Sequence, residues 1–113
     1  MSLREMQSEF AALVARLIDE AIAMGYDVTL GDAYRDPRVF GVLGTALGYG
    51  HRNSGHKLRL ALDLNLFKAG KYLEGTDAHR ALGEWWEKQH SLARWGGRFS
   101  DGNHYSFEYE GVK

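Results

Sequence analysis

The chain has 113 residues, of which 44% are hydrophobic, with 14 glycines, one proline and no cysteine. This length suits one domain, residues 1–113, that can bury a core. The absence of cysteine excludes disulfides and thiolate metal sites, so any metal must be held by His, Asp or Glu. Lys and Arg number 14 and Asp and Glu number 15, for a formal charge of −1. This near-neutral balance argues against a nucleic-acid-binding protein.

The sequence shows no membrane signal. No apolar run approaches the roughly 20 residues of a transmembrane helix, and the first residues lack the apolar segment of a signal peptide. We therefore expect a monomer that is made in the cytoplasm without a membrane anchor. If such a protein acts outside the cytoplasm, another agent must release it.

The N-terminal segment is predicted to form an amphipathic helix. Its apolar residues recur at steps of three and four: Leu3, Met6, Phe10, Leu13, Leu17 and Ala21. Ser2 and Glu5 fit a capping box, and Gly25 stands where a helix C-terminal cap is expected. Residues 28–30 then indicate a short strand.

The next segment is rich in glycine. Asp36 and Pro37 can cap and open another helix. Glycines at positions 41, 44, 48 and 50 would weaken that helix. We therefore expect residues 38–53 to be largely loop.

Alternation in the middle of the chain predicts a half-buried strand. Four leucines at positions 60, 62, 64 and 66 alternate with Ala61, Asp63 and Asn65. The leucines would face the core, which places Asp63 on the opposite face. Residues 68–71 indicate a hairpin turn, with residues 72–73 returning.

The last third predicts a second helix and a final strand. Thr76 is expected to cap a helix over residues 77–89, with His79 and His90 exposed. After the turn signal at residues 100–103, a strand runs from His104 to about Tyr109. The expected fold is one α+β domain in which a small antiparallel sheet packs with helices.

Two of these strands carry side chains that can bind a metal. Asp63 and His104 lie on faces away from the core, and antiparallel neighbours bring such side chains within about 5.5 Å at Cβ. His56 would complete a set of two His and one carboxylate, with a position left for water as in catalytic zinc sites. His51 is a rival ligand. Asp101 is the candidate general base, since a tight turn at Gly102 can bring it beside His104; the alternative is a simple turn-former.

Two segments resemble the zinc-dependent peptidases of family M15. Ser54-Gly55-His56 followed by Ala61-Leu62-Asp63 resembles the S-x-H-x(4)-A-x-D motif, and residues 101–104 match the D-x-x-H segment. The resemblance implies that zinc is bound by His56, Asp63 and His104, and that Asp101 is the catalytic base.

Two flanking segments extend the resemblance over residues 33–108. Residues 33–37 resemble a G-Y-R-S-P-like segment whose Arg contacts substrate, which implies a substrate-binding role for Arg35. Trp95-Gly96-Gly97 is similar to the W-G-G before the last motif. Ser54 is expected to bind substrate or to hydrogen-bond the ligand loop. The family often has Gly where this chain has Arg59.

The resemblance implies a Hedgehog/DD-peptidase-like fold and a zinc-dependent peptidase that acts on the stem peptides of bacterial peptidoglycan. A domain without a leader resembles a phage or prophage endolysin, which waits in the host cytoplasm until a holin opens the membrane. An L-alanyl-D-glutamate endopeptidase is therefore favoured. The alternatives are a D-Ala-D-Ala carboxypeptidase or dipeptidase and a non-catalytic cell-wall-binding module. The ligand set also suits other divalent ions, including iron.

Overall fold

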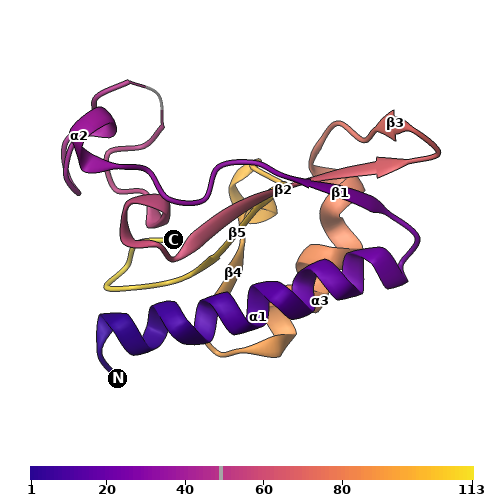
Figure 1. The fold of residues 1–113 in the computed structure, drawn as a ribbon, viewed down its shortest axis with the longest axis horizontal. Helices are drawn as coiled ribbons and strands as arrows, with labels where there is room; N and C mark the ends of the chain where they lie inside the picture. The colour runs from indigo at the N-terminus through magenta and orange to yellow at the C-terminus, as the bar shows by residue number, and fades with distance from the viewer. Residues whose placement is uncertain (49) are drawn as a thin grey trace.

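The computed structural model describes residues 1–48 and 50–113. The elements in chain order are α1 (Leu3–Ala23), β1 (Asp27–Leu30), α2 (Pro37–Phe40), the 3-10 helix η1 (Gly55–Leu58), β2 (Ala61–Lys68), β3 (Lys71–Tyr72), the 3-10 helix η2 (Thr76–His79), α3 (Arg80–Gln89), β4 (Ala93–Trp95), the 3-10 helix η3 (Gly96–Phe99) and β5 (His104–Phe107) (Figure 1). None of the helices within the described ranges combines the length and apolar character needed to cross a lipid bilayer.

All strand pairs in the sheet are antiparallel, in the order β1-β2-β5-β4, with β3 also paired to β2. The predicted strand over residues 28–30 and the hairpin at 68–71 are confirmed. The edge strand β4 was not predicted, because its three residues are too few to show an alternating pattern. The expected α+β domain with a small antiparallel sheet is confirmed.

Helix α1 begins and ends where its capping residues predict. The Ser2 hydroxyl accepts a hydrogen bond from the Glu5 amide at 3.1 Å, and the Glu5 carboxylate accepts one from the Ser2 amide at 3.2 Å. Gly25 follows the last turn with φ of +95°, a left-handed conformation that glycine adopts without steric cost.

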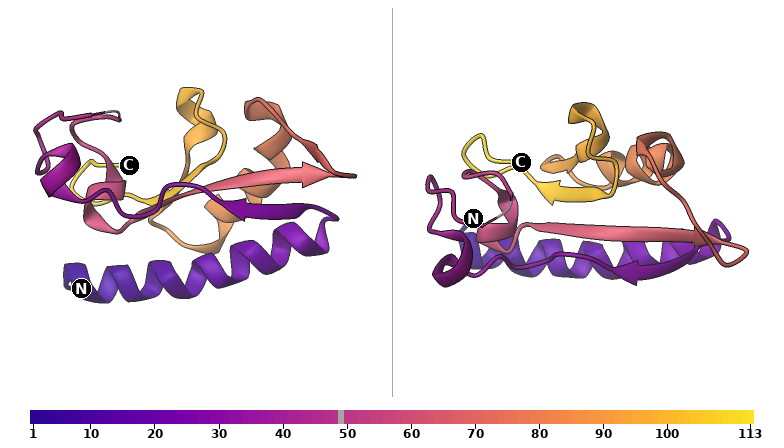
Figure 2. Two further views of the ribbon diagram at one scale, coloured as in Figure 1. Left: turned by 45° about the horizontal axis from the view of Figure 1, so that its top comes forward. Right: turned by 90° about the horizontal axis from the view of Figure 1, so that it is seen from above.

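The core lies where α1 and α3 meet the leucine face of the sheet, and Figure 2 shows α1 running along that sheet. Phe10 of α1 packs edge-on against Trp86 of α3 and Phe107 of β5, with ring centroids 5.8 and 5.3 Å apart. The four leucines of the predicted strand are buried here. Residues that alternate with them, Asp63 among them, therefore point to the opposite face.

The last third differs from the predictions in its helix, in the burial of His79 and in the end of its final strand. The helix expected over residues 77–89 is a 3-10 turn followed by α3, and the Thr76 side chain does not cap it. Gly75, with φ of +87°, turns the chain so that His79 is only 3% exposed, and its Nδ1 lies 2.7 Å from the Tyr105 hydroxyl. The final strand ends at Phe107 rather than near Tyr109, because Tyr109 pairs locally with Val112.

His90 was also expected to be exposed, and it is half-buried at the end of α3. Its ring stacks on Phe107 with centroids 4.5 Å apart, and its Nε2 lies 3.3 Å from a Glu9 carboxylate oxygen of α1. His90 thus joins the two helices on the core side of the sheet and lies outside the group of candidate ligands.

Candidate metal centre

Asp63 of β2 and His104 of β5 are direct partners in the antiparallel register. Because the neighbouring residues Leu62, Leu64 and Tyr105 face the core, both polar side chains project from the other face of the sheet. His104 Nδ1 lies 3.5 Å from Asp63 Oδ1. The sequence pattern therefore placed these two residues on the correct face and in neighbouring strands.

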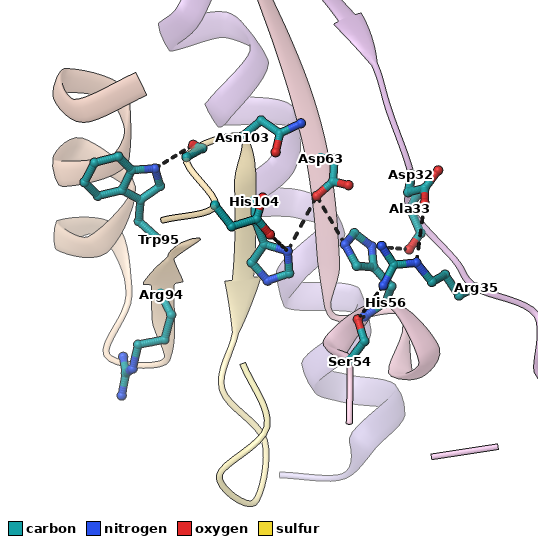
Figure 3. A network of polar contacts seen from close by, with 12 residues as sticks. Asp32, Ala33, Arg35, Ser54, His56, Asp63, Arg94, Trp95, Asn103 and His104 are labelled. Atoms are coloured by element: carbon teal, nitrogen blue, oxygen red, sulfur yellow. Dashed lines mark hydrogen bonds and ion pairs between the residues drawn. The ribbon is translucent and has the colours of Figure 1, made fainter. Parts of the chain in front are cut away.

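His56 reaches the same carboxylate oxygen from η1, the 3-10 helix that precedes β2 (Figure 3). The Ser54 hydroxyl caps this helix by accepting a hydrogen bond from the His56 amide at 3.2 Å. His56 Nε2 lies 3.2 Å from Asp63 Oδ1. The ligand atoms of His56, Asp63 and His104 all lie within 4.8 Å of one another.

These separations fit a shared metal ion. With ligand bonds of about 2.0–2.1 Å, two ligand atoms of a tetrahedral zinc site stand about 3.3 Å apart. The distances of 3.2 and 3.5 Å from Asp63 Oδ1 to the two imidazole nitrogens are close to that separation. The three residues could therefore hold a metal ion between them.

The hydrogen bond made by His56 Nδ1 determines which ring nitrogen faces Asp63. His56 Nδ1 lies 2.8 Å from the Ala33 carbonyl oxygen, which can only accept, so Nδ1 carries the proton of this bond. A neutral His56 then presents the lone pair of Nε2 to Asp63 Oδ1. Two acceptors at this distance repel each other unless a proton or a metal ion lies between them. A carbonyl that orients a histidine in this way is typical of metal ligands.

The site is buried and its polar atoms are incompletely satisfied. Within residues 1–48 and 50–113, Asp63 Oδ1 and His104 Nε2 are buried and have no hydrogen-bond partner. Burial raises the pKa of Asp63, but the imidazoles of His104 and His56 beside its carboxylate outweigh this effect and hold that pKa well below its usual range. Asp63 is therefore an anion at neutral pH, as a metal ligand must be.

Asp101 lies beside this group on the turn that precedes β5. Its Oδ2 is 3.9 Å from His104 Nδ1, and its side chain is 53% exposed. The His104 amide donates a hydrogen bond to the Asp101 carbonyl at 3.1 Å, which closes the predicted tight turn. Asp101 is thus an accessible carboxylate next to the candidate metal ligands, while its role as a base stays a prediction.

Arg35 and Ser54 form one hydrogen-bonded unit next to His56. Arg35 Nη1 donates to the Ser54 hydroxyl at 3.0 Å, and Nε lies 3.4 Å from an Asp32 carboxylate oxygen. The Arg35 amide also donates to the His56 carbonyl at 3.0 Å. Ser54 is 5% exposed, and its hydroxyl already accepts a hydrogen bond from the His56 amide. Substrate binding by either residue stays a prediction.

A cleft of about 430 Å³ opens over these residues. It is lined by Arg35, Gly50, His51, Asn53, Ser54, His56, Phe99, Asp101, His104 and Lys113. His51, the rival ligand, is exposed, and its Nδ1 accepts a hydrogen bond from the Asn53 amide at 3.0 Å. It does not belong to the group that can hold the metal.

Two residues near the site were not singled out from the sequence. Lys57 is buried, and its Nζ donates to the carbonyls of Thr45 and Arg52, at 2.5 and 3.3 Å, so it ties the glycine-rich loop to η1. Phe99 stands on the cleft edge with its ring 5.7 Å from that of His104. The local sequence does not indicate either role, because both depend on contacts with other segments of the chain.

Arg59 ends η1 in a left-handed conformation, with φ of 57°. Glycine adopts this conformation most easily, which gives a physical reason for glycine at this position in the peptidases that the motif resembles. In this chain the Arg59 guanidinium lies 3.9 Å from the centre of the Tyr34 ring. This cation–π contact offsets part of the backbone strain.

Comparison of the chain with protein-family models and with curated proteins finds no match.

Proposed function

We propose that this protein is a zinc-dependent peptidase that hydrolyses stem-peptide bonds of bacterial peptidoglycan. The observation that carries the proposal is the convergence of His56, Asp63 and His104 on one point, with the Asp101 carboxylate 3.9 Å from a ligand atom. The motifs around these four residues resemble those of the M15 peptidases. A Hedgehog/DD-peptidase-like fold is the corresponding proposal for the architecture.

The donor set suits a catalytic zinc ion. Two imidazole nitrogens and one carboxylate oxygen are a common zinc ligand set, and three protein ligands leave one position open, whereas structural sites have four. Zinc bound here would supply a Lewis acid that lowers the pKa of water and polarises a carbonyl. His56, held through Nδ1 by the Ala33 carbonyl, and His104, fixed in β5, keep the ligand geometry rigid.

Asp101 is the residue that moves the proton. Its half-exposed carboxylate reaches the cleft, where it can accept a proton from the attacking water. The same carboxyl then returns the proton to the leaving amine. The Asp101 carboxylate is suited to both steps because it lies outside the ligand group.

Arg35 is the proposed anchor for a carboxylate of the stem peptide. It lines the cleft and is braced by Ser54 and Asp32. A guanidinium binds a carboxylate with two parallel hydrogen bonds, which fixes both position and orientation. Ser54 would then act by holding Arg35 and the His56 loop together.

The favoured substrate bond is that between L-alanine and D-glutamate, and the biological role is that of a phage or prophage endolysin released by a holin. Cleavage of a D-Ala-D-Ala bond is the second candidate. Incubation of purified stem peptides followed by mass spectrometry distinguishes them, because the first releases a peptide that begins with D-glutamate and the second releases D-alanine.

Turbidity of permeabilised Gram-negative cells tests the peptidase itself. The protein should clear the suspension, lose this activity with a chelator and regain it with added zinc. Asp101→Ala should bind zinc and fail to clear. A protein that binds isolated walls without releasing any peptide would instead be a non-catalytic wall-binding module.

A further inference from the structure

The turn that carries Asp101 is held by a buried tryptophan from the neighbouring edge strand. Trp95 is the last residue of β4 and is fully buried. Its indole Nε1 donates a hydrogen bond of 2.7 Å to the carbonyl of Gly102 (Figure 3). A short hydrogen bond from a buried donor fixes the middle of the turn between Asp101 and His104.

The indole ring itself has almost no freedom to move. A Cβ at Gly83 of α3 or at Gly97 of η3 would overlap the ring, so the backbone lies directly against it at both positions. The guanidinium groups of Arg98 and Arg80 lie 5.2 and 5.4 Å from the ring centre. Trp95 therefore connects α3 rigidly to the turn.

Two further contacts hold the same turn. The Asp101 amide donates to the Gly96 carbonyl at 2.8 Å. On the other side, a Cβ at Gly102 would lie 2.5 Å from the Thr76 Cα, so Gly102 is packed directly against η2. The turn is thus enclosed between η3, η2 and the Trp95 indole.

We infer that Trp95 is a positioning residue for Asp101. The inference rests on the proposed function, since it assigns Trp95 the task of holding the proposed base beside the metal ligands. Trp95 is fully buried and is not among the residues that line the cleft. Its effect passes through the Gly102 carbonyl to the neighbouring Asp101 backbone, and a displacement of about 1 Å can cost a factor of about 100 in rate.

The test substitutes Trp95→Phe, which keeps an aromatic ring and removes the hydrogen bond. The matched control is Trp86→Phe, because Trp86 is also fully buried and its Nε1 donates to the carbonyls of Arg94 and Ser106, at 3.0 and 3.2 Å, rather than to the turn. The first readout is hydrogen exchange of the Asp101 and His104 amides in the metal-free protein. Trp95→Phe should accelerate the exchange of both amides at least tenfold. Trp86→Phe should leave both exchange rates unchanged once any change in global stability is subtracted.

The second readout is steady-state hydrolysis of a stem peptide by the zinc-loaded protein. Trp95→Phe should lower kcat at least tenfold and change KM less than twofold, whereas Trp86→Phe should change neither. Gly102→Ala, which pushes the turn away from Thr76, should give the same loss and serves if Trp95→Phe does not fold.

If Trp95→Phe leaves the exchange of the turn amides unchanged, Trp95 does not position Asp101. The same holds if Trp95→Phe leaves kcat unchanged while Asp101→Ala abolishes activity. Either result leaves the proposed function intact. If Asp101→Ala retains full activity, Asp101 is not the base. If the zinc-loaded parent protein releases no peptide, the proposed function fails. In both cases the exchange measurement still decides whether Trp95 holds the turn.

Discussion

Asp63 Oδ1 lies 3.2 Å from His56 Nε2 and is the single point on which the candidate site converges. The opposite nitrogen of His56 is committed to the Ala33 carbonyl, so the contact between Nε2 and the carboxylate requires a positive charge between them or on the ring. His104 approaches the same oxygen at 3.5 Å. One buried oxygen shared by two imidazoles is an arrangement that a divalent cation satisfies.

Removal of either histidine ligand should abolish stoichiometric metal binding. We expect His56→Ala and His104→Ala to weaken zinc binding by more than 100-fold, beyond the about 10–100-fold that loss of an outer-shell partner costs. His51→Ala, in the same cleft, should bind zinc like the parent protein. Titration with a competing chromophoric chelator gives the three affinities, and a normal affinity in His56→Ala would refute its assignment as a ligand.

Substitution of Asp101 should separate metal binding from catalysis. Asp101→Asn removes the proton acceptor with little change in size, so hydrolysis of stem peptides should fall by about 10²–10⁴. Zinc content should stay at the parent level, because Asp101 lies outside the ligand group. Asp19→Asn, at an exposed position of α1, is the control for a lost surface charge. Parent-level turnover by Asp101→Asn would rule out its role as base.

Arg35→Lys should weaken substrate binding more than it slows chemistry. The substitution keeps the positive charge but loses the planar fork, and a hydrogen bond to a charged group contributes about 1.5–3 kcal/mol. We expect KM to rise about tenfold or more and kcat to change less than about threefold. Arg38→Lys is the matched control, because its side chain is 89% exposed and paired with Asp36. Equal KM values for the two variants would contradict a substrate-binding role for Arg35.

His79 makes stability depend on pH. Burial lowers the pKa of His79 from 6.5 to about 4. The unfolded chain therefore binds more protons than the folded one between these values, so this contribution to stability is complete above pH 6.5 and declines as pH falls toward 4. At about 1.4 kcal/mol per pKa unit, the loss approaches 3 kcal/mol.

His79→Gln removes this titration and can still hydrogen-bond the Tyr105 hydroxyl. Urea unfolding of both metal-free proteins at pH 7.5 and pH 4 should show a smaller loss of free energy in the variant than in the parent protein. Because the two chains share all other titratable groups, the difference isolates His79. An equal loss in both would show that His79 does not titrate as its burial implies.

The sequence predicted most accurately what depends on local pattern. Alternation of leucines placed Asp63 on the correct face of a strand, and the Asp101–Asn103 turn set the start of the strand that carries His104. The capping box of α1 likewise follows from residues three apart. These features need only the period of a strand or the geometry of a helix end.

Features that depend on distant contacts were not predictable. His79 was expected to be exposed because its segment reads as a polar helix start, yet Tyr105, in another strand, provides a buried partner. Trp95 lies fully buried against Gly83 of α3 and Gly97 of η3, and the W-G-G segment alone does not indicate the contact with α3. The Ser54 hydroxyl accepts a hydrogen bond from Arg35, which is 19 residues away, so this contact could not be predicted from the local sequence.

The measurement that bears most directly on the metal centre is X-ray diffraction from crystals of the zinc-loaded protein, with data on both sides of the zinc absorption edge. We predict one anomalous peak per chain, at about 2.0–2.1 Å from His56 Nε2 and His104 Nδ1 and within bonding distance of Asp63 Oδ1. No peak between these atoms in crystals that contain zinc elsewhere, or imidazoles turned away from one another, would contradict the metal centre and the peptidase proposed from it.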